Sequence, residues 1–196
     1  FLHIWNHGLF KALLFLGAGS VLHATGTREM SRMGGLWRAM PWTAGLFALG
    51  AVAISALPPL NGFVSEWLIY LGLFDAVAGH ARAAVITVPA TIALGVTGAL
   101  ALAAFVKAGA VVFLGATRTQ GAAHAHECGW WMRGPMVALA AACGFMALAP
   151  VVVWPLIQPP LGMWNQTWLS TEAPAPLATL GGVQPLNAMD TCLCMG

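Results

Sequence analysis

Four long runs of apolar residues dominate the chain and limit what it can fold into. They span about residues 1–24, 41–74, 83–116 and 134–158. A helix needs about 20 apolar residues to cross the ~30 Å hydrocarbon core of a bilayer. Only 7% of the 196 residues are charged, whereas soluble domains have about 25%, so a water-facing surface is not expected. The sequence predicts an all-α, polytopic membrane helix bundle with about four transmembrane segments, one of them broken.

Composition also limits the partners and cofactors. The formal net charge is only +2 and the chain has no run of basic residues, which argues against nucleic acid and leaves the lipid bilayer as the expected surroundings. The four cysteines are Cys128, Cys143, Cys192 and Cys194. Their spacing fits neither a zinc nor an iron–sulfur site, so we expect no metal and no cofactor in this chain. Because it begins without methionine, we expect it to be an internal piece of a longer protein.

The second apolar run is too long for one ordinary helix. Its roughly 34 residues at 1.5 Å each would extend about 50 Å. Proline removes a backbone donor and clashes with the preceding turn, so the run is expected to form two half-helices, about 41–57 and 63–74. The interrupting residues are Pro58, Pro59, Asn61 and Gly62. Such a break is tolerated in a membrane only where it is buried in protein or lines a wet cavity. The alternative is a simple proline kink.

The arginines predict the orientation of the bundle. If each run crosses the membrane once, the first and third joints lie on one side. Those joints contain Arg28, Arg32, Arg38, Arg118 and Arg133, whereas the other side has only Arg82. The positive-inside rule then places the first and third joints in the cytoplasm.

Three ionisable residues in the first apolar run share one helical face. His3, His7 and Lys11 are spaced i, i+4, i+8, which places neighbours about 6 Å apart along the axis. Histidine titrates near neutral pH and a lysine removed from water releases its proton more readily, so this row suits proton transfer through intervening water. The alternatives are histidines at the membrane surface with a snorkelling lysine, or a metal bound by His3 and His7.

Two further charges lie inside apolar runs. Glu66 follows the predicted break, next to Ser65, where a carboxylate is favoured by the helix dipole; it is a candidate for the proton path or a simple capping acid. Lys107 lies deep in the third run, and a charge there is costly enough to suggest an ion path. Its alternative is a snorkelling lysine without a role in transport.

His124, His126 and Glu127 cluster in the third joint. We interpret them as solvated loop residues in preference to a metal site.

Several segments together resemble a known family. They are "NHGLFKALLFLGAGSVLHATGTREMSRMGGLWRAMP", "AISALPPLNGFVSEWLIY", "FVKAGAVVFLGATR" and "HAHECGWWMRGPMVALAAACGFMALAP". The chain resembles the antiporter-like membrane subunits of respiratory complex I, Mrp-type cation/proton antiporters and membrane-bound hydrogenases, and within them the branch of hydrogenase-4 component B and formate hydrogenlyase. The resemblance covers residues 1–158, and residues 159–196 read as a linker or the start of a C-terminal extension.

The resemblance implies a fold of two inverted repeats, each with a broken helix, of which residues 1–158 would form the C-terminal part. It implies that His3, His7 and Lys11 match central proton-path residues and that Glu66 matches the terminal charge on the broken helix. It also implies a multi-pass subunit of a prokaryotic plasma (inner) membrane. Partner membrane subunits would connect it to hydrogenase or dehydrogenase arm subunits, and any redox centre would belong to those partners.

Three functions remain open at this point. The leading hypothesis is a proton-translocating, non-redox subunit that couples electron transfer in its partners to H⁺ movement. The alternatives are an Mrp-type antiporter subunit that moves protons against a cation such as Na⁺, and a structural membrane anchor with an inactive ion path.

Overall fold

The computed structural model describes residues 1–79, 84–150, 152, 153 and 155, and every regular element among them is helical. In chain order the elements are α1 (Leu2–Thr25), η1 (Met30–Arg32), α2 (Leu36–Ala39), α3 (Pro41–Ile54), α4 (Asn61–Gly79), α5 (Ala84–Phe113), α6 (Gln120–Ala123) and α7 (Trp130–Leu148). The predicted all-α class is confirmed. The predicted extension, residues 159–196 with Cys192 and Cys194, lies outside the described residues.

The chain divides into two compact units. One consists of His3–Leu148, and the other of Phe1–Leu2 with Ala149–Gly196. All that follows concerns the first unit, which contains α1 from His3 onward and every later helix.

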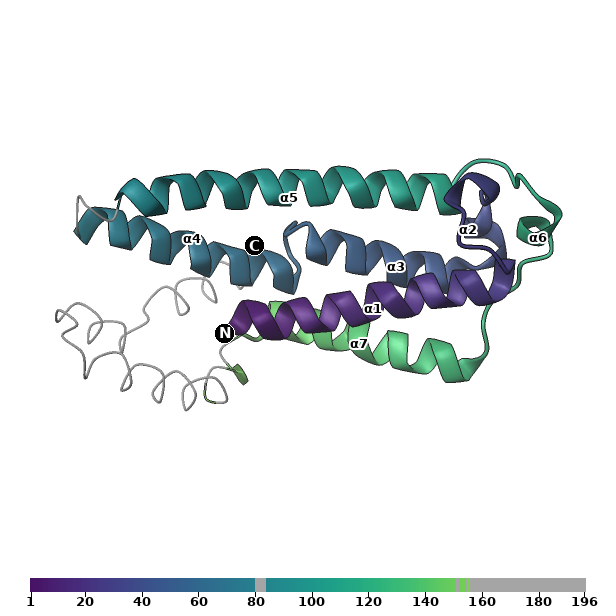
Figure 1. The fold of residues 1–196 in the computed structure, drawn as a ribbon. Coiled ribbons are helices and arrows are strands. Elements are labelled where there is room, and N and C mark those ends of the chain that lie inside the picture. The colour runs from purple at the N-terminus through teal and green to yellow at the C-terminus, as the bar shows by residue number, and fades with distance from the viewer. Residues whose placement is uncertain (80–83, 151, 154, 156–196) are drawn as a thin grey trace. The chain divides into compact units, whose positions relative to one another are not determined.

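The membrane-crossing helices are recognised by their length and apolar composition. Helices α1, α5 and α7 each meet both conditions, and α3 is a shorter apolar helix. Helices α3 and α4 lie end to end alongside α5 (Figure 1), so together they form a broken counterpart of one continuous helix. At 1.5 Å per residue, α5 is about 45 Å long. The chain is a multi-pass membrane protein with three continuous segments and one broken segment.

The helix break consists of residues 55–60, between α3 and α4. Two half-helices were predicted correctly, but their predicted limits were wrong: Asn61 and Gly62 begin α4 and are not part of the break. The carbonyl of Leu60 already accepts hydrogen bonds from the amides of residues 63 and 64. The two prolines precede this turn, where a missing amide proton removes no bond from the helix.

Gly62 lets the two half-helices approach each other closely. A Cβ atom at this position would overlap the carbonyl oxygen of Ala53 in the last turn of α3. Only glycine has no Cβ, so it is the residue that permits backbone to lie this close. The sequence therefore determines both halves of the break: prolines end α3, and a glycine allows α4 to start against it.

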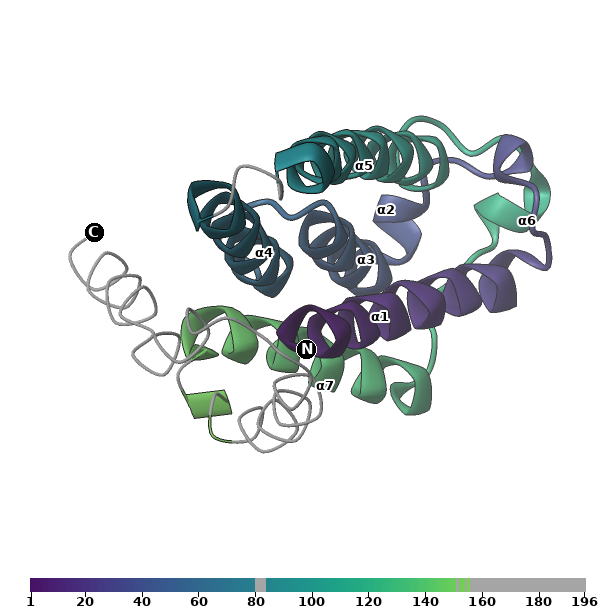
Figure 2. The same cartoon turned by 60° about the vertical axis from the view of Figure 1, so that its left-hand side comes forward.

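The helices form layers around α3. Figure 2 shows α3 between α5 on one side and the pair of α1 and α7 on the other. One core cluster joins Phe10 of α1, Ala53 of α3 and Cys143 of α7, all of them 1% exposed or less. A second cluster one turn along joins Leu13, Met136 and Ala140. These contacts hold the N-terminal half of α1 against the helix break.

The first and third joints lie at the same end of this unit, as expected if each apolar run crosses the membrane once. The Gly35 amide donates to the Leu114 carbonyl at 3.0 Å, and the Thr119 hydroxyl donates to the Arg32 carbonyl at 2.9 Å. One detail of the prediction was wrong, because Arg133 belongs to the first turn of α7 and not to the joint. Arg82 lies outside the described residues.

Helix α5 presents a row of apolar side chains on its outer face. The exposed ones are Val85, Ile86, Val88, Ile92, Val96, Leu100 and Val106. Exposing such a surface to water would cost free energy, whereas contact with lipid tails or with another apolar helix would not. The exposed row is therefore what a membrane-spanning helix requires.

Candidate functional site

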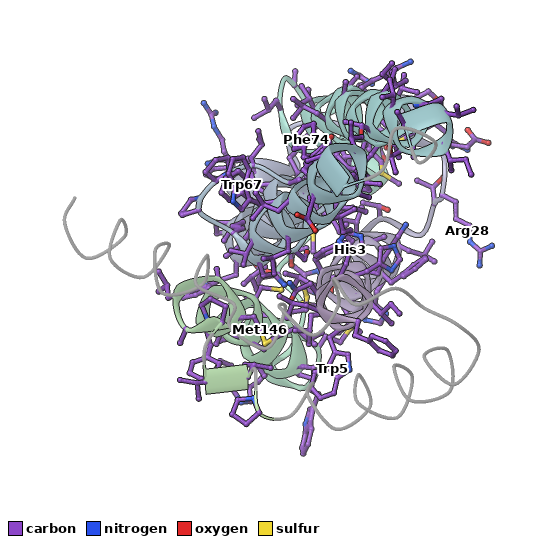
Figure 3. The ribbon with its side chains drawn as sticks, turned by 90° about the vertical axis from the view of Figure 1, so that its left-hand side faces the viewer. His3, Trp5, Arg28, Trp67, Phe74 and Met146 are labelled. Atoms are coloured by element: carbon purple, nitrogen blue, oxygen red, sulfur yellow. The ribbon has the colours of Figure 1, made fainter. Side chains whose placement is uncertain are left out.

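The predicted row on α1 is present as one face of a continuous helix. The rings of His3 and His7 have centroids 6.1 Å apart, and both lie against the ring of Phe10. His3 is partly buried, whereas His7 is exposed. Figure 3 shows His3 directed toward the centre of the bundle and Trp5, on the same helix, directed outward. The two histidines are close enough for one water molecule to connect them.

Lys11, the third member of the row, lies one turn beyond His7. Its side chain is partly buried, and its Nζ atom lies 5.9 Å from the centre of the exposed Phe15 ring. An ammonium group over an aromatic face is favourable. Among the described residues no carboxylate lies within ion-pair distance of Lys11, because the one ion pair found there joins Glu29 and Arg32.

His3 connects α1 to the first turn of α4. Its Nδ1 atom lies 3.0 Å from the hydroxyl oxygen of Ser65, which is 1% exposed. The Ser65 hydroxyl donates to the carbonyl oxygens of Asn61 and Gly62, each at 3.1 Å. With the hydroxyl proton directed to those carbonyls, Ser65 is left to accept, so we assign the Nδ1–H tautomer to neutral His3. The other ring nitrogen, Nε2, is then the proton acceptor.

Asn6 provides a second connection between the same two helices. Its side-chain amide donates to the Asn61 carbonyl at 2.8 Å, and both asparagines are fully buried. The Asn61 carbonyl oxygen therefore accepts from both Asn6 and Ser65. Residues of the predicted break and of the predicted histidine row thus meet at one point, where α4 begins.

Glu66 lies one residue beyond Ser65 but faces a different helix. One residue turns an α-helix by about 100°, and the Glu66 Oε2 atom lies 3.9 Å from where a Cβ on Gly98 of α5 would be. The Tyr70 hydroxyl, one turn further along α4, lies beside Gly95 of α5 in the same way. Two glycines of α5 therefore leave room for two polar side chains of α4. Glu66 itself is partly buried.

Lys107 does not join this group. It is exposed on α5, nine residues, or about 14 Å of helix, beyond Gly98. Because α5 ends at Phe113, Lys107 lies only about 9 Å of helix rise from that end. This distance suits a side chain that reaches the membrane surface, which is the snorkelling alternative for Lys107. Its part in a proton path stays a prediction.

The loop acid Glu127 has a structural role that sequence reasoning missed. Its carboxylate accepts hydrogen bonds from the Trp42 amide at 2.9 Å and from the Thr43 hydroxyl at 2.5 Å. It therefore caps the N-terminus of α3 from a position 85 residues away in the chain. His124 and His126 are exposed. No cluster of three metal-ligating side chains occurs within the described ranges.

Asn6 and Ser65 were also missed as partners in the site. Their signal was present, because each is a small polar residue one or two positions from a candidate site residue in an apolar helix. Sequence spacing shows which face of its own helix each residue occupies. It does not show which other helix that face meets.

Comparison with known proteins connects this arrangement to one family. Residues 1–92 match the family model described as NADH:quinone oxidoreductase/Mrp antiporter, transmembrane. These residues, slightly less than half of the chain, have the sequence of that family's transmembrane domain. The match contains the whole histidine–lysine row, the helix break and Glu66, so the predicted family resemblance is confirmed.

Relatives of this family from Escherichia coli K12 cover most of the chain. Hydrogenase-4 component B is 45% identical over 148 residues, which are 75% of this chain and 22% of that protein. Formate hydrogenlyase subunit 3 is 40% identical over 156 residues, 79% of this chain and 26% of that protein. The chain therefore spans about a quarter of the length of these relatives.

The fold is also that of a solved family structure. The Mrp complex from Dietzia sp. DQ12-45-1b contains a chain that matches with a TM-score of 0.61 at 20% sequence identity. The match covers 76% of this chain and 34% of that one. At this identity the likeness establishes the shared helix arrangement.

Proposed function

We propose that this chain is part of a proton-translocating membrane subunit of the hydrogenase-4/formate hydrogenlyase kind or of a related complex-I-like oxidoreductase. The observation on which the proposal rests is the contact between His3 and Ser65. It connects a row of titratable groups on α1 to the start of α4, one residue before Glu66. Ionisable groups gathered beside a helix break inside a membrane are typical of ion paths.

The chemistry follows from the groups themselves. A neutral histidine can accept a proton on one ring nitrogen and release one from the other. The ring is then neutral again, and a proton has passed from one side of it to the other. In the assigned tautomer, His3 would accept a proton at Nε2 and donate at Nδ1 to Ser65. Lys11 supplies a proton acceptor and donor two turns away, and Glu66 supplies a carboxylate on the far side of α4.

The exposure of His7 and the partial exposure of Lys11 support a larger assembly. An ionisable side chain facing lipid at the middle of a helix costs about 2.5–3.5 kcal/mol on insertion scales. The face with His7 and Lys11 is therefore expected to pack against other parts of the full subunit or to line water. We propose further membrane subunits as partners, connected to hydrogenase or dehydrogenase arm subunits that would hold the redox centres. The expected location is the prokaryotic inner membrane.

Lys11→Ala in the complete complex tests the proposal. Reconstituted vesicles would be supplied with electron donor and acceptor, and proton uptake and electron transfer would be measured together. We expect redox-driven proton uptake to be lost while electron transfer continues. Arg28→Ala is the matched control, because that basic side chain is exposed in the joint after α1 and is not a candidate for the proton path. Unchanged proton uptake in Lys11→Ala would contradict the proposal and favour the inactive anchor.

The same vesicles separate proton pumping from cation/proton antiport. A family member of the antiporter kind would exchange protons for Na⁺ or K⁺ down an imposed cation gradient without electron transfer. If a cation gradient drives proton movement and Lys11→Ala abolishes it, the result would favour an Mrp-type antiporter subunit over a proton-translocating subunit of an oxidoreductase.

A further inference from the structure

The pair of asparagines at the helix break leaves buried polar atoms without partners. Asn6 and Asn61 are both 0% exposed. The Asn6 Nδ2 atom donates to the Asn61 carbonyl, but Asn6 Oδ1 and both Asn61 amide atoms, Oδ1 and Nδ2, find no hydrogen-bond partner among the described residues. Buried polar atoms in proteins are nearly always paired, because burying one unpaired is costly. Something beyond these side chains is expected to satisfy the three atoms.

The mixture of donor and acceptor atoms identifies the occupant. The unpaired set contains two acceptors, the Oδ1 atoms, and one donor, Asn61 Nδ2. Exchanging the oxygen and nitrogen positions of the Asn61 amide leaves that set unchanged. A bare cation would be repelled by the amide protons and an anion by the carbonyl oxygens. Water donates two hydrogen bonds and accepts as well, so it matches this set.

The surroundings favour ordered water in the same place. Ser65 and Asn6 both donate to the Asn61 carbonyl oxygen, so the unpaired atoms adjoin the His3–Ser65 contact. Cys143 of α7 lies in the core cluster with Phe10 and Ala53, and Leu60, the residue before Asn61, packs against the same cluster. The thiol is 0% exposed and free. A buried water typically has two to four polar partners.

We propose that Asn6 and Asn61 bind ordered water at the start of α4, between α1 and α7, in contact with the Cys143 thiol. The water site is a property of the fold and does not depend on proton transport. Its use as a step next to His3 and Ser65 rests on the proposed function.

The S–H stretching band of Cys143 is a built-in probe of this water. Infrared spectra of the complete complex would be recorded in H₂O and after transfer to D₂O, and Cys143→Ala would identify the band by its loss. We expect a band shifted by hydrogen bonding that converts to S–D after transfer. Cys128 is the matched control, because it is also buried but already contacts Ser20 and Thr43, and its band is expected to stay unchanged when Asn6 is replaced.

Asn6→Leu tests the role of the asparagine, with a side chain of similar volume that cannot bind water. We expect the Cys143 band to lose its hydrogen-bond shift and its exchange to slow at least severalfold. A band in the unmodified complex without hydrogen-bond shift or deuterium exchange would overturn the proposal, whether or not the variant assembles. Lys11→Ala is expected to leave the Cys143 band unchanged. Loss of proton uptake in vesicles therefore tests the proposed function, and the Cys143 band tests the water site independently of it.

Discussion

The Nδ1 atom of His3 and the hydroxyl oxygen of Ser65 lie 3.0 Å apart, although 62 residues separate them in the chain. Ser65 is held in place by the carbonyls of Asn61 and Gly62 in its own helix. Since the Ser65 hydroxyl donates its proton to those carbonyls, its oxygen is available to accept a hydrogen bond from the histidine. The contact fixes the ring orientation of His3 and joins the histidine row to the broken helix.

Replacing Ser65 by alanine tests this contact. The variant leaves the His3 Nδ1 atom without its partner, and a hydrogen bond of this kind contributes about 0.5–1.5 kcal/mol. We expect redox-driven proton uptake to fall about three- to tenfold, with electron transfer retained. Ser20→Ala is the control, since Ser20 is an equally buried serine whose hydroxyl contacts Met136 instead.

A double-mutant cycle with His3→Gln decides whether the two residues act together. If they do, Ser65→Ala has little further effect once His3 is replaced. Additive losses in the double variant would show that Ser65 acts independently of His3 and would contradict its positioning role.

Gly62→Ala is expected to destabilise the break strongly. The new methyl group would overlap the Ala53 carbonyl oxygen, so α3 and α4 must move apart, at a cost of about 1–3 kcal/mol or more. Thermal unfolding of the purified complex and the yield of assembled complex measure the effect. Gly72→Ala in the same helix is the control, because nothing lies within 4 Å of its Cβ position. That change is expected to stabilise α4 by about 0.5–1 kcal/mol. Equal behaviour of both variants would contradict the close approach.

Glu66→Gln separates a charge-handling role from a capping role. The amide has nearly the same shape as the carboxylate and still accepts hydrogen bonds, so the fold beside Gly98 should be retained. We expect proton uptake to fall at least tenfold while the amount of assembled complex stays within twofold of the unmodified protein. Loss of assembly together with loss of uptake would instead indicate that Glu66 serves mainly to stabilise the start of α4.

Glu127→Ala should weaken the N-terminus of α3 without affecting the ion path. The Trp42 amide and the Thr43 hydroxyl lose their acceptor, and removal of a helix cap costs about 0.5–2 kcal/mol. A lower melting temperature with unchanged coupling of proton uptake to electron transfer is the expected result. Glu29→Ala is the matched control: its contact with Arg32 is an exposed ion pair at 3.9 Å, which is worth at most about 1 kcal/mol. A melting temperature no lower than that of the control would rule out the capping role.

Much of the fold was predictable because membrane helices are specified by local sequence. An apolar run of sufficient length must satisfy its backbone hydrogen bonds internally, so it forms a helix whatever it packs against. The two prolines likewise determined that a break occurs. The limits of the break were less predictable, because the Leu60 carbonyl begins the new helix directly after the prolines and brings Asn61 and Gly62 into α4.

By itself the sequence determined the all-helical membrane fold, the broken segment, the shared face of His3, His7 and Lys11, and the family. Only the tertiary structure decided that His3 meets Ser65, that Asn6 meets Asn61, that Glu66 faces Gly98 and that Glu127 caps α3. The physical reason is that periodicity specifies the direction of a side chain relative to its own helix axis. Partner choice depends on how helices far apart in the chain rotate and pack, and short apolar side chains in a bilayer permit many such packings until glycines and buried polar pairs select one.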